Sequence, residues 1–129
     1  MPQFIIDVLN LNFKKFYTPS ETVFIDETLI LFKGKCSHKQ HIKNKPKNTG
    51  LKFYSICDSS HYLYDFWLYI GKKQIDKRSN KPIEIIKKFV SVLPHKETII
   101  VCDNYYGSLE LGDELHKMNK KFYFHCSNQ

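Results

Sequence analysis

Two aspartates stand at positions in the sequence where a side chain could do chemistry. Asp103 ends the apolar run of residues 99–102 and is followed by an amide and two tyrosines. Asp26 lies near the middle of residues 22–33, where β-branched and aromatic residues alternate with a period of two. In α/β sheets, functional groups gather just beyond the carboxyl ends of strands. Asp103 is therefore a candidate functional residue, although an Asp–Asn pair also favours an ordinary turn.

The chain is basic, and its positive charge is unevenly distributed. The formal net charge is +7 and the pI is about 9.2. Between Lys33 and Lys52 the sequence is rich in lysine, contains two histidines and has no acid. This clustering favours a polyanionic partner such as nucleic acid. The alternative is an overall lysine-rich composition that is unrelated to function.

Length and composition indicate one globular domain. The chain has 129 residues, of which 42% are hydrophobic and 15% aromatic, enough for a real core. It has no long apolar stretch and no signal-peptide pattern, so we expect a soluble intracellular protein without a membrane partner. The four cysteines lack a CxxC pair and are expected to be free thiols.

The hydrophobic periodicity predicts an α/β fold. An N-terminal helix is expected over residues 4–16, with Ile5, Leu9, Phe13 and Phe16 at helical spacing. The core is expected over residues 22–126, as three strands followed by helix, strand, helix and strand. The strands are predicted at 22–33, 51–57, 62–69, 99–102 and 121–126. One core helix is predicted to begin at Pro82, and a second begins near residue 109 with Ser108 as its N-cap.

Four segments in this order resemble the catalytic domain of piggyBac-type transposases. They are IDETLILFKGK (25–35), KNKPKNTGLKFYSICDS (43–59), YLYDFWLYIG (62–71) and CDNYYGSLEL (102–111). The resemblance covers nearly the whole chain, and several motifs at compatible spacing are far more specific than one short motif. It implies an RNase H-like mixed sheet with a DDE active site.

The resemblance also implies roles for individual residues. Asp26 matches the first catalytic aspartate and Asp103 the second, on two adjacent parallel strands. Two carboxylates there could hold Mg²⁺ or Mn²⁺, which would support nicking, hairpin formation and strand transfer. We expect DNA contacts from Lys33, Lys35, Lys45, Lys47, Lys52, Asn104 and Tyr106. Location in the nucleus is expected from the family, and a full-length transposase or a second copy is a further partner.

The chain also departs from the family pattern. The third catalytic aspartate of the family has no counterpart before Gln129, and strand alternation turns Glu27 away from Asp26. We therefore expect residues 1–129 to be a single partial catalytic domain, incomplete at the C-terminus. It would hold the ion weakly and would not catalyse transposition alone. The alternative is a non-catalytic remnant that binds DNA or a transposase.

Two other clusters suggest simpler roles. Cys36, His38 and His41 lack a fourth ligand at zinc spacing, so they favour a basic loop over a metal site. Cys102 is expected to be a core thiol, because neighbouring residues of a strand point to opposite faces. Of Tyr105 and Tyr106, one is expected to pack inward and the other to border the DNA path.

Overall fold

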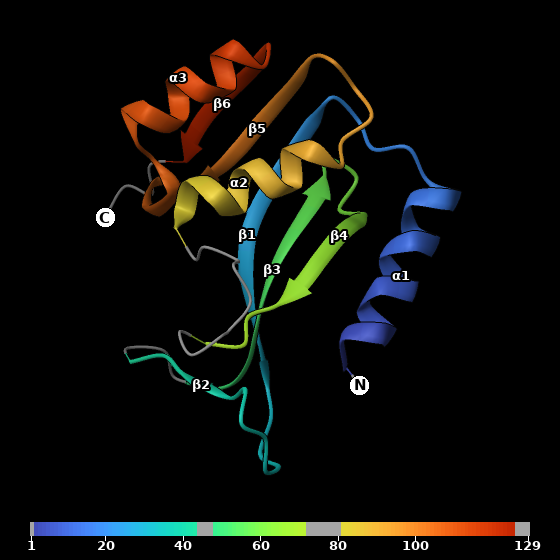
Figure 1. The fold of residues 1–129 in the computed structure, drawn as a ribbon, viewed down its shortest axis with the longest axis vertical. Coiled ribbons are helices and arrows are strands. Elements are labelled where there is room, and N and C mark those ends of the chain that lie inside the picture. The colour runs from blue at the N-terminus through green and yellow to red at the C-terminus, as the bar shows by residue number, and fades with distance from the viewer. Residues whose placement is uncertain (1, 44–47, 72–80, 126–129) are drawn as a thin grey trace.

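The computed structural model describes residues 2–43, 48–71 and 81–125 of the chain. Within them, a mixed sheet is flanked by three α-helices (Figure 1). The helices are α1 (Pro2–Phe16), α2 (Pro82–Ser91) and α3 (Leu109–Lys117), with the short 3-10 helix η1 (Asn104–Tyr106) between β5 and α3. The strands are β1 (Thr22–Leu31), β2 (Gln40–His41), β3 (Thr49–Asp58), β4 (Leu63–Leu68), β5 (Thr98–Asp103) and β6 (Lys120–His125).

The strand order is β2-β3-β1-β5-β6, and β4 pairs with β3. Strand β3 runs antiparallel to β1 and to β4, whereas β5 runs parallel to both β1 and β6. The prediction of three antiparallel strands followed by helix, strand, helix and strand is therefore confirmed, with the two-residue β2 as an addition. At Gly50 on β3, an added Cβ would lie 2.1 Å from the Ile30 carbonyl oxygen of β1, so only glycine fits there.

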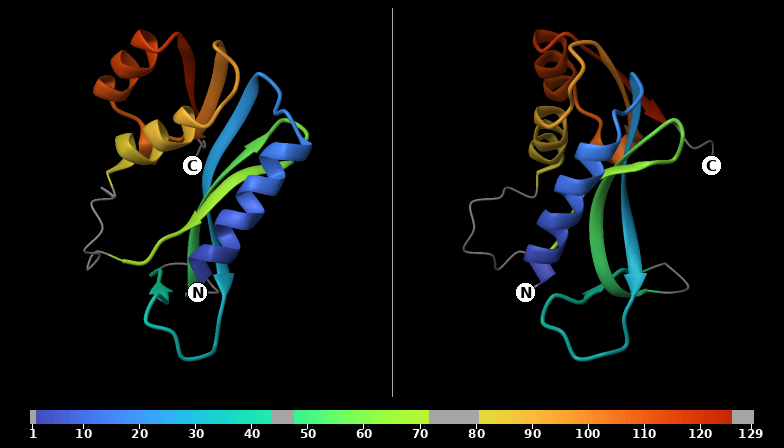
Figure 2. Two further views of the ribbon diagram at one scale, coloured as in Figure 1. Left: turned by 45° about the vertical axis from the view of Figure 1, so that its right-hand side comes forward. Right: turned by 90° about the vertical axis from the view of Figure 1, so that its right-hand side faces the viewer.

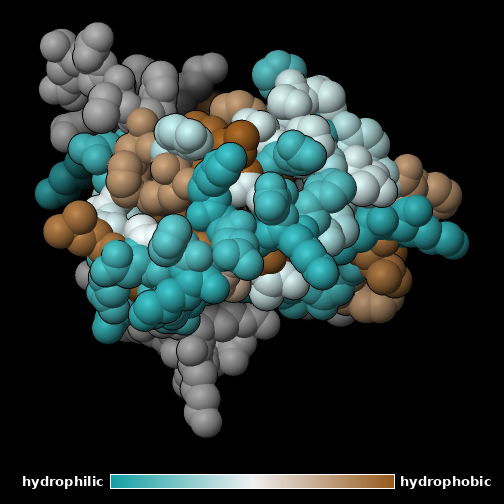
Figure 3. All heavy atoms as spheres, turned by 90° about the horizontal axis from the view of Figure 1, so that it is seen from above, coloured by the Kyte–Doolittle hydropathy of each residue, from teal (hydrophilic) through white to brown (hydrophobic). Residues whose placement is uncertain are grey.

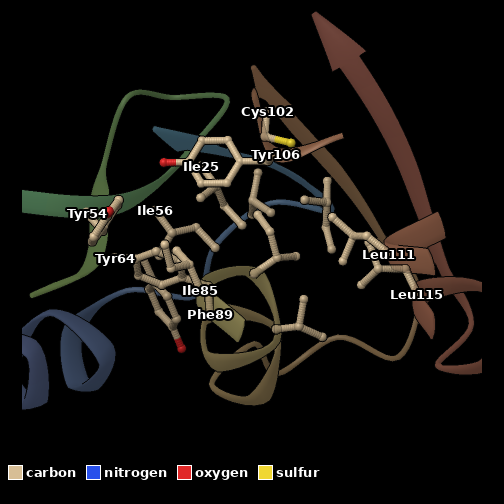
Figure 4. Packing of buried hydrophobic residues seen from close by; sticks show 14 residues of the cluster. Ile25, Tyr54, Ile56, Tyr64, Ile85, Phe89, Cys102, Tyr106, Leu111 and Leu115 are labelled. Carbon is tan, nitrogen blue, oxygen red and sulfur yellow. The ribbon is translucent and has the colours of Figure 1, made fainter. Parts of the chain in front are cut away.

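Helices α2 and α3 cover one face of the sheet, and α1 lies along the edge strand β4 (Figure 2). The core forms where α2 and α3 meet β1, β3 and β5. Figure 4 shows Phe89 of α2 and Leu111 and Leu115 of α3 packed with Ile25 and other residues of this cluster. The end of the molecule at which β1 and β5 begin is mostly hydrophilic, with scattered hydrophobic patches (Figure 3).

Helix α1 forms where the sequence predicts it, but its packing face only partly coincides with the predicted one, because Phe13 packs inward whereas Ile5 and Phe16 do not. Ile6 is buried and Phe13 contacts Phe66 of β4 at 6.2 Å between ring centroids. Ile5 and Phe16, which share the predicted apolar face, are 59% and 76% exposed. Asn10 anchors the helix instead, because its side chain bonds both the backbone N–H and the carbonyl of Phe66.

The segment between α1 and β1 is fixed to the β3–β4 turn by one buried carboxylate. Asp58 is 1% exposed and accepts hydrogen bonds from the Tyr17 hydroxyl at 2.5 Å and the Ser20 N–H at 3.2 Å. It also accepts from the N–H groups of Ser60 and Tyr62 and from the Ser60 hydroxyl. Asp58 therefore sets how β1 enters the sheet.

None of the described helices is long and apolar enough to cross a membrane.

Candidate functional site

Asp26 lies on the face of β1 that α2 and α3 leave uncovered. Its neighbour Ile25 is 1% exposed and belongs to the core, while Asp26 and Phe24 are exposed. This alternation follows from the two-residue period of a strand. One carboxylate oxygen of Asp26 accepts a hydrogen bond from the Glu27 N–H at 2.7 Å, which restrains the side chain at the surface.

Asp103 ends β5, the parallel neighbour of β1. The last paired residues of the two strands are Ile25 and Cys102, so Asp26 and Asp103 are the next residues along each strand. Ile25 and Cys102 are both buried, and strand alternation therefore directs both aspartates to the uncovered face. The predicted adjacency of the two strands is confirmed by this pairing.

The two carboxylates provide the oxygen ligands that hard divalent ions prefer. Both are exposed, and Phe24 and Tyr123 on the same face are 42% and 56% exposed, so the surface is open to solvent. Among the described residues, no group of three or more histidine, cysteine, aspartate or glutamate side chains could hold a metal ion. The donors therefore fit one ion that keeps several waters, and they are too few for a pair of ions.

The described part of residues 33–52 likewise contains no metal-binding cluster. Cys36 and His38 are half-buried in the loop before β2, and His41 is exposed on β2. Cys102 is 3% exposed, and its burial, with smaller effects of Asp103 and Asp26, raises the pKa of its thiol to about 12. The prediction that Cys102 is a core thiol is thus confirmed.

Behind the two aspartates lies a polar network on the core face. The Tyr106 hydroxyl donates to Glu27 Oε2 at 3.1 Å, and Lys52 Nζ lies 3.2 Å from the same oxygen. Burial alone would lower the pKa of Lys52, but the attraction of Glu27 raises it overall. Burial and the neighbouring Glu27 raise the pKa of Tyr106, so its hydroxyl stays protonated and donates.

This network corrects one predicted DNA contact, Tyr106, and involves a second, Lys52. Tyr106 is 2% exposed and packs in the core, whereas Tyr105 is 65% exposed. Lys52 pairs with Glu27 and its ammonium lies 5.0 Å from the Tyr54 ring centroid, with the side chain only 18% exposed. Both side chains are thus engaged inside the protein, because each sits on the core face of its element.

The other predicted contacts lie at two separate places. Asn104 is exposed in η1, directly after Asp103. Lys33 and Lys35 are exposed in the loop that follows β1, at the end of the molecule away from the start of β1 (Figure 1). Lys45 and Lys47 fall outside the described residues.

Sequence reasoning missed the role of Glu27. It predicted that Glu27 faces away from Asp26, and the burial pattern and the bond to Tyr106 agree with this. A buried or half-buried charge needs hydrogen-bonded partners, so the Asp–Glu pair inside a strand was itself the signal.

Comparison with known proteins identifies the family of this chain. A family model described as Transposase IS4 matches residues 2–124, and the chain belongs to this transposase family. It is similar to the piggyBac transposase in a cryo-EM structure of its synaptic complex with hairpin DNA, with a TM-score of 0.82 and 27% identity. That match covers 95% of this chain and 26% of the piggyBac chain. The predicted piggyBac-type resemblance and RNase H-like transposase fold are therefore confirmed.

A second solved structure is much less similar. The crystal structure of a pre-cleavage Mos1 transpososome matches with a TM-score of 0.49 and 14% identity, over 95% of this chain and 41% of that chain.

Proposed function

We propose that Asp26 and Asp103 are two carboxylate ligands of a divalent ion, Mg²⁺ or Mn²⁺, in the DNA transposition chemistry of this family. The observation that carries the proposal is the parallel pairing of β1 with β5, whose last paired residues immediately precede the two aspartates. Family membership supports a phosphodiester as the substrate. In this proposal residues 1–129 act as one partial catalytic domain.

When bound, such an ion supplies Lewis-acid stabilisation of the charge that develops on phosphodiester oxygens. The contribution of this chain is to hold and orient. Asp26 and Asp103 present oxygens on the open face of the sheet, where a DNA strand has room to approach. Nicking uses water as the nucleophile, and hairpin formation and strand transfer use a 3′-hydroxyl.

The proposed DNA path runs from this face toward the lysine-rich loop. Lys33 and Lys35 are exposed and would contact phosphates without reading sequence. Beside the acids, Asn104 stays a proposed contact to DNA, and the exposed Tyr105 replaces the buried Tyr106. Lys45 and Lys47 stay in the proposal from the sequence alone. The piggyBac structure supports DNA as the partner, because that transposase is bound to hairpin DNA.

A second function is favoured by the small number of acids at the site. The described residues hold no group of three or more metal-binding side chains, and paired-ion chemistry needs more negative ligands than two aspartates. By itself the 129-residue chain would then bind DNA, a full-length transposase or a second copy without cutting DNA. We propose location in the nucleus for either function.

Ion binding tests the role of the two aspartates directly. The signal of free Mn²⁺ in electron paramagnetic resonance reports how much ion the protein binds, without requiring turnover. We expect weak binding by the wild-type chain that is lost in Asp26→Asn and in Asp103→Asn. Asp113→Asn is the matched control, since Asp113 is an exposed acid on α3. Equal binding by all four proteins would refute the proposed site.

Salt dependence tests the role of the loop in DNA binding. Removal of one lysine–phosphate interaction should reduce the slope of log K against log salt by about 0.9, so Lys33→Gln/Lys35→Gln should lower it by about 2. The control is Lys96→Gln/Lys117→Gln, which removes the same charge from exposed positions elsewhere. If both double variants change the slope equally, the effect is one of net charge and the loop has no special role.

A further inference from the structure

One hydrogen bond links the immediate surroundings of the two proposed ion ligands. Glu27 directly follows Asp26 in β1, and Tyr106 lies three residues after Asp103, at the end of η1. The Tyr106 hydroxyl donates to Glu27 Oε2 at 3.1 Å. This bond therefore connects the two aspartates on the core side of the sheet. The connection runs from Asp26 to its neighbour Glu27, across the hydrogen bond to Tyr106, and back along the chain to Asp103.

This link lies where the pairing of the two strands has ended. The last backbone pair between β1 and β5 is Ile25 with Cys102, one residue before the aspartates. Beyond it, Asp103 remains paired with His125 of β6, on the side away from β1. The Tyr106–Glu27 bond is thus a tie between β1 and the segment after β5 at the level of the two carboxylates.

Both ends of the bond are held in place by their own surroundings. Tyr106 is 2% exposed and packs beside Ile25 in the core (Figure 4). Glu27 is fixed by Lys52, whose ammonium lies 3.2 Å from Glu27 Oε2 and 5.0 Å from the centroid of the Tyr54 ring. A hydrogen bond between a protonated phenol and a carboxylate is charge-assisted, and such bonds are shorter and stronger than neutral ones.

We propose that Tyr106 and Glu27 are positioning residues, which set the separation of the Asp26 and Asp103 carboxylates from the core face of the sheet. This inference rests on the proposed function, because it assumes that the two aspartates bind one ion. Neither residue would touch the ion: alternation turns Glu27 to the core face of β1, and Tyr106 is buried in the core. Their effect is to keep the two carboxylates at a distance that one ion can span.

Removing only the Tyr106 hydroxyl tests this role. We expect Tyr106→Phe to bind Mn²⁺ about threefold to tenfold more weakly than the wild type, at the lower end of the effects seen for residues that orient metal ligands. Tyr64→Phe is the matched control: Tyr64 is 5% exposed and its hydroxyl donates to the Val92 carbonyl, away from the aspartates. Both variants lose one buried hydroxyl, so a merely structural effect should lower their melting temperatures without separating their ion affinities.

A second pair of variants separates hydrogen bonding from charge. Glu27→Gln and Glu27→Met both remove one negative charge and both leave Lys52 without its partner carboxylate. Only glutamine keeps an oxygen that accepts from the Tyr106 hydroxyl. We therefore expect Glu27→Gln to bind Mn²⁺ more tightly than Glu27→Met, by a smaller factor than the one that separates wild type from Tyr106→Phe, because the bond to glutamine is neutral.

Two results would overturn the inference, and they differ in what they say of the proposed function. If wild-type Mn²⁺ binding requires Asp26 and Asp103 but Tyr106→Phe binds as tightly as Tyr64→Phe, the ion site stands and the positioning role is refuted. If no Mn²⁺ binding depends on the two aspartates, the proposed site and the positioning role are refuted together. The proposed ion site and the positioning role are both supported if Tyr106→Phe binds Mn²⁺ more weakly than Tyr64→Phe and Glu27→Met binds it more weakly than Glu27→Gln.

Discussion

Replacement of the buried Asp58 by asparagine should strongly destabilise the fold. The Asp58 carboxylate is 1% exposed and accepts five hydrogen bonds, from Tyr17, Ser20, Ser60 (two) and Tyr62. In Asp58→Asn, one oxygen can keep the bonds from Ser60 and Tyr62. The new amide N–H groups would face the Ser20 N–H and the Tyr17 hydroxyl, where the carboxylate had accepted at 3.2 and 2.5 Å.

The magnitude follows from the hydrogen bonds that the substitution removes. A hydrogen bond to a charged group contributes about 1.5–3 kcal/mol, and a buried donor without a partner costs about 1–3 kcal/mol. The Tyr17 hydroxyl can rotate to accept, so the Ser20 N–H carries most of the cost. We therefore expect Asp58→Asn to lower the free energy of unfolding by about 3 kcal/mol, which corresponds to a fall of about 10 °C in Tm for a domain of this size.

Urea and thermal unfolding at neutral pH measure this change. Asp113→Asn makes the same charge change at an exposed position on α3 and should stay within about 0.5 kcal/mol of the wild type. If Asp58→Asn were as stable as Asp113→Asn, the five hydrogen bonds of Asp58 would not hold the α1–β1 segment to the β3–β4 turn, and the reasoning would fail.

The same carboxylate predicts a pH dependence. Burial alone would raise the pKa of Asp58, but the hydrogen bonds from Ser60, Tyr17, Ser20 and Tyr62 lower it well below its ordinary value. A carboxyl group whose pKa is lower in the folded state stabilises the fold at neutral pH, and this contribution is lost as the pH falls below about 4. The difference in the free energy of unfolding between wild type and Asp58→Asn should therefore shrink below that pH. A difference that stays constant would contradict a lowered pKa for Asp58 in the folded state.

Three further outcomes are expected. The 129-residue chain should not nick, hairpin or join a transposon-end duplex with Mg²⁺ or Mn²⁺, because the described residues hold no cluster of three metal-binding side chains; turnover that is abolished by Asp103→Asn would contradict this. Ser108→Ala should cost about 1 kcal/mol in urea unfolding, since the Ser108 hydroxyl oxygen accepts from the Leu111 N–H at 3.1 Å and caps α3; no loss would rule out the cap. At about pH 8, iodoacetamide should label Cys102 far more slowly than the half-buried Cys36, because burial raises the pKa of Cys102 to about 12; equal rates by mass spectrometry would argue against a buried thiol.

The sequence by itself determined the main elements and placed Asp26 and Asp103 on two different strands. Strand alternation needs only the order of residues, so it placed Asp26 and Glu27 on opposite faces before any contact was known. The fold then decided that Glu27 faces the core and Asp26 the open side. An apolar run without alternation, such as residues 99–102, is typical of a strand covered on both faces. In the fold one face is open, because Tyr123 is exposed and Val101 is only half-buried. The resemblance to piggyBac-type transposases supplied what periodicity could not, namely that the first and fourth long strands are neighbours.

The packing face of α1 was decided only by tertiary structure. A helical period shows that apolar residues can share a face, but it does not say which face meets a partner. In the fold, Asn10 bonds the backbone of Phe66 at the edge of β4, and this orients the helix so that Ile6 and Phe13 turn inward. Phe16 is left exposed, although it fits the predicted apolar face.

At the site, tertiary structure decided which of the two adjacent tyrosines packs in the core and which is exposed. Nothing in the dipeptide Tyr105–Tyr106 distinguishes its members, because a 3-10 turn directs successive side chains to different sides and the turn can begin at either phase. In the fold Tyr106 is the member that packs in the core, where its hydroxyl reaches Glu27, and Tyr105 is exposed. Lys52 was predicted to bind DNA from charge alone, and it became a partner of Glu27 because β3 pairs with β1 in the register that sets Glu27 opposite Tyr54. Charge and periodicity are local properties, whereas the partner of a charged side chain depends on residues brought together from distant parts of the chain.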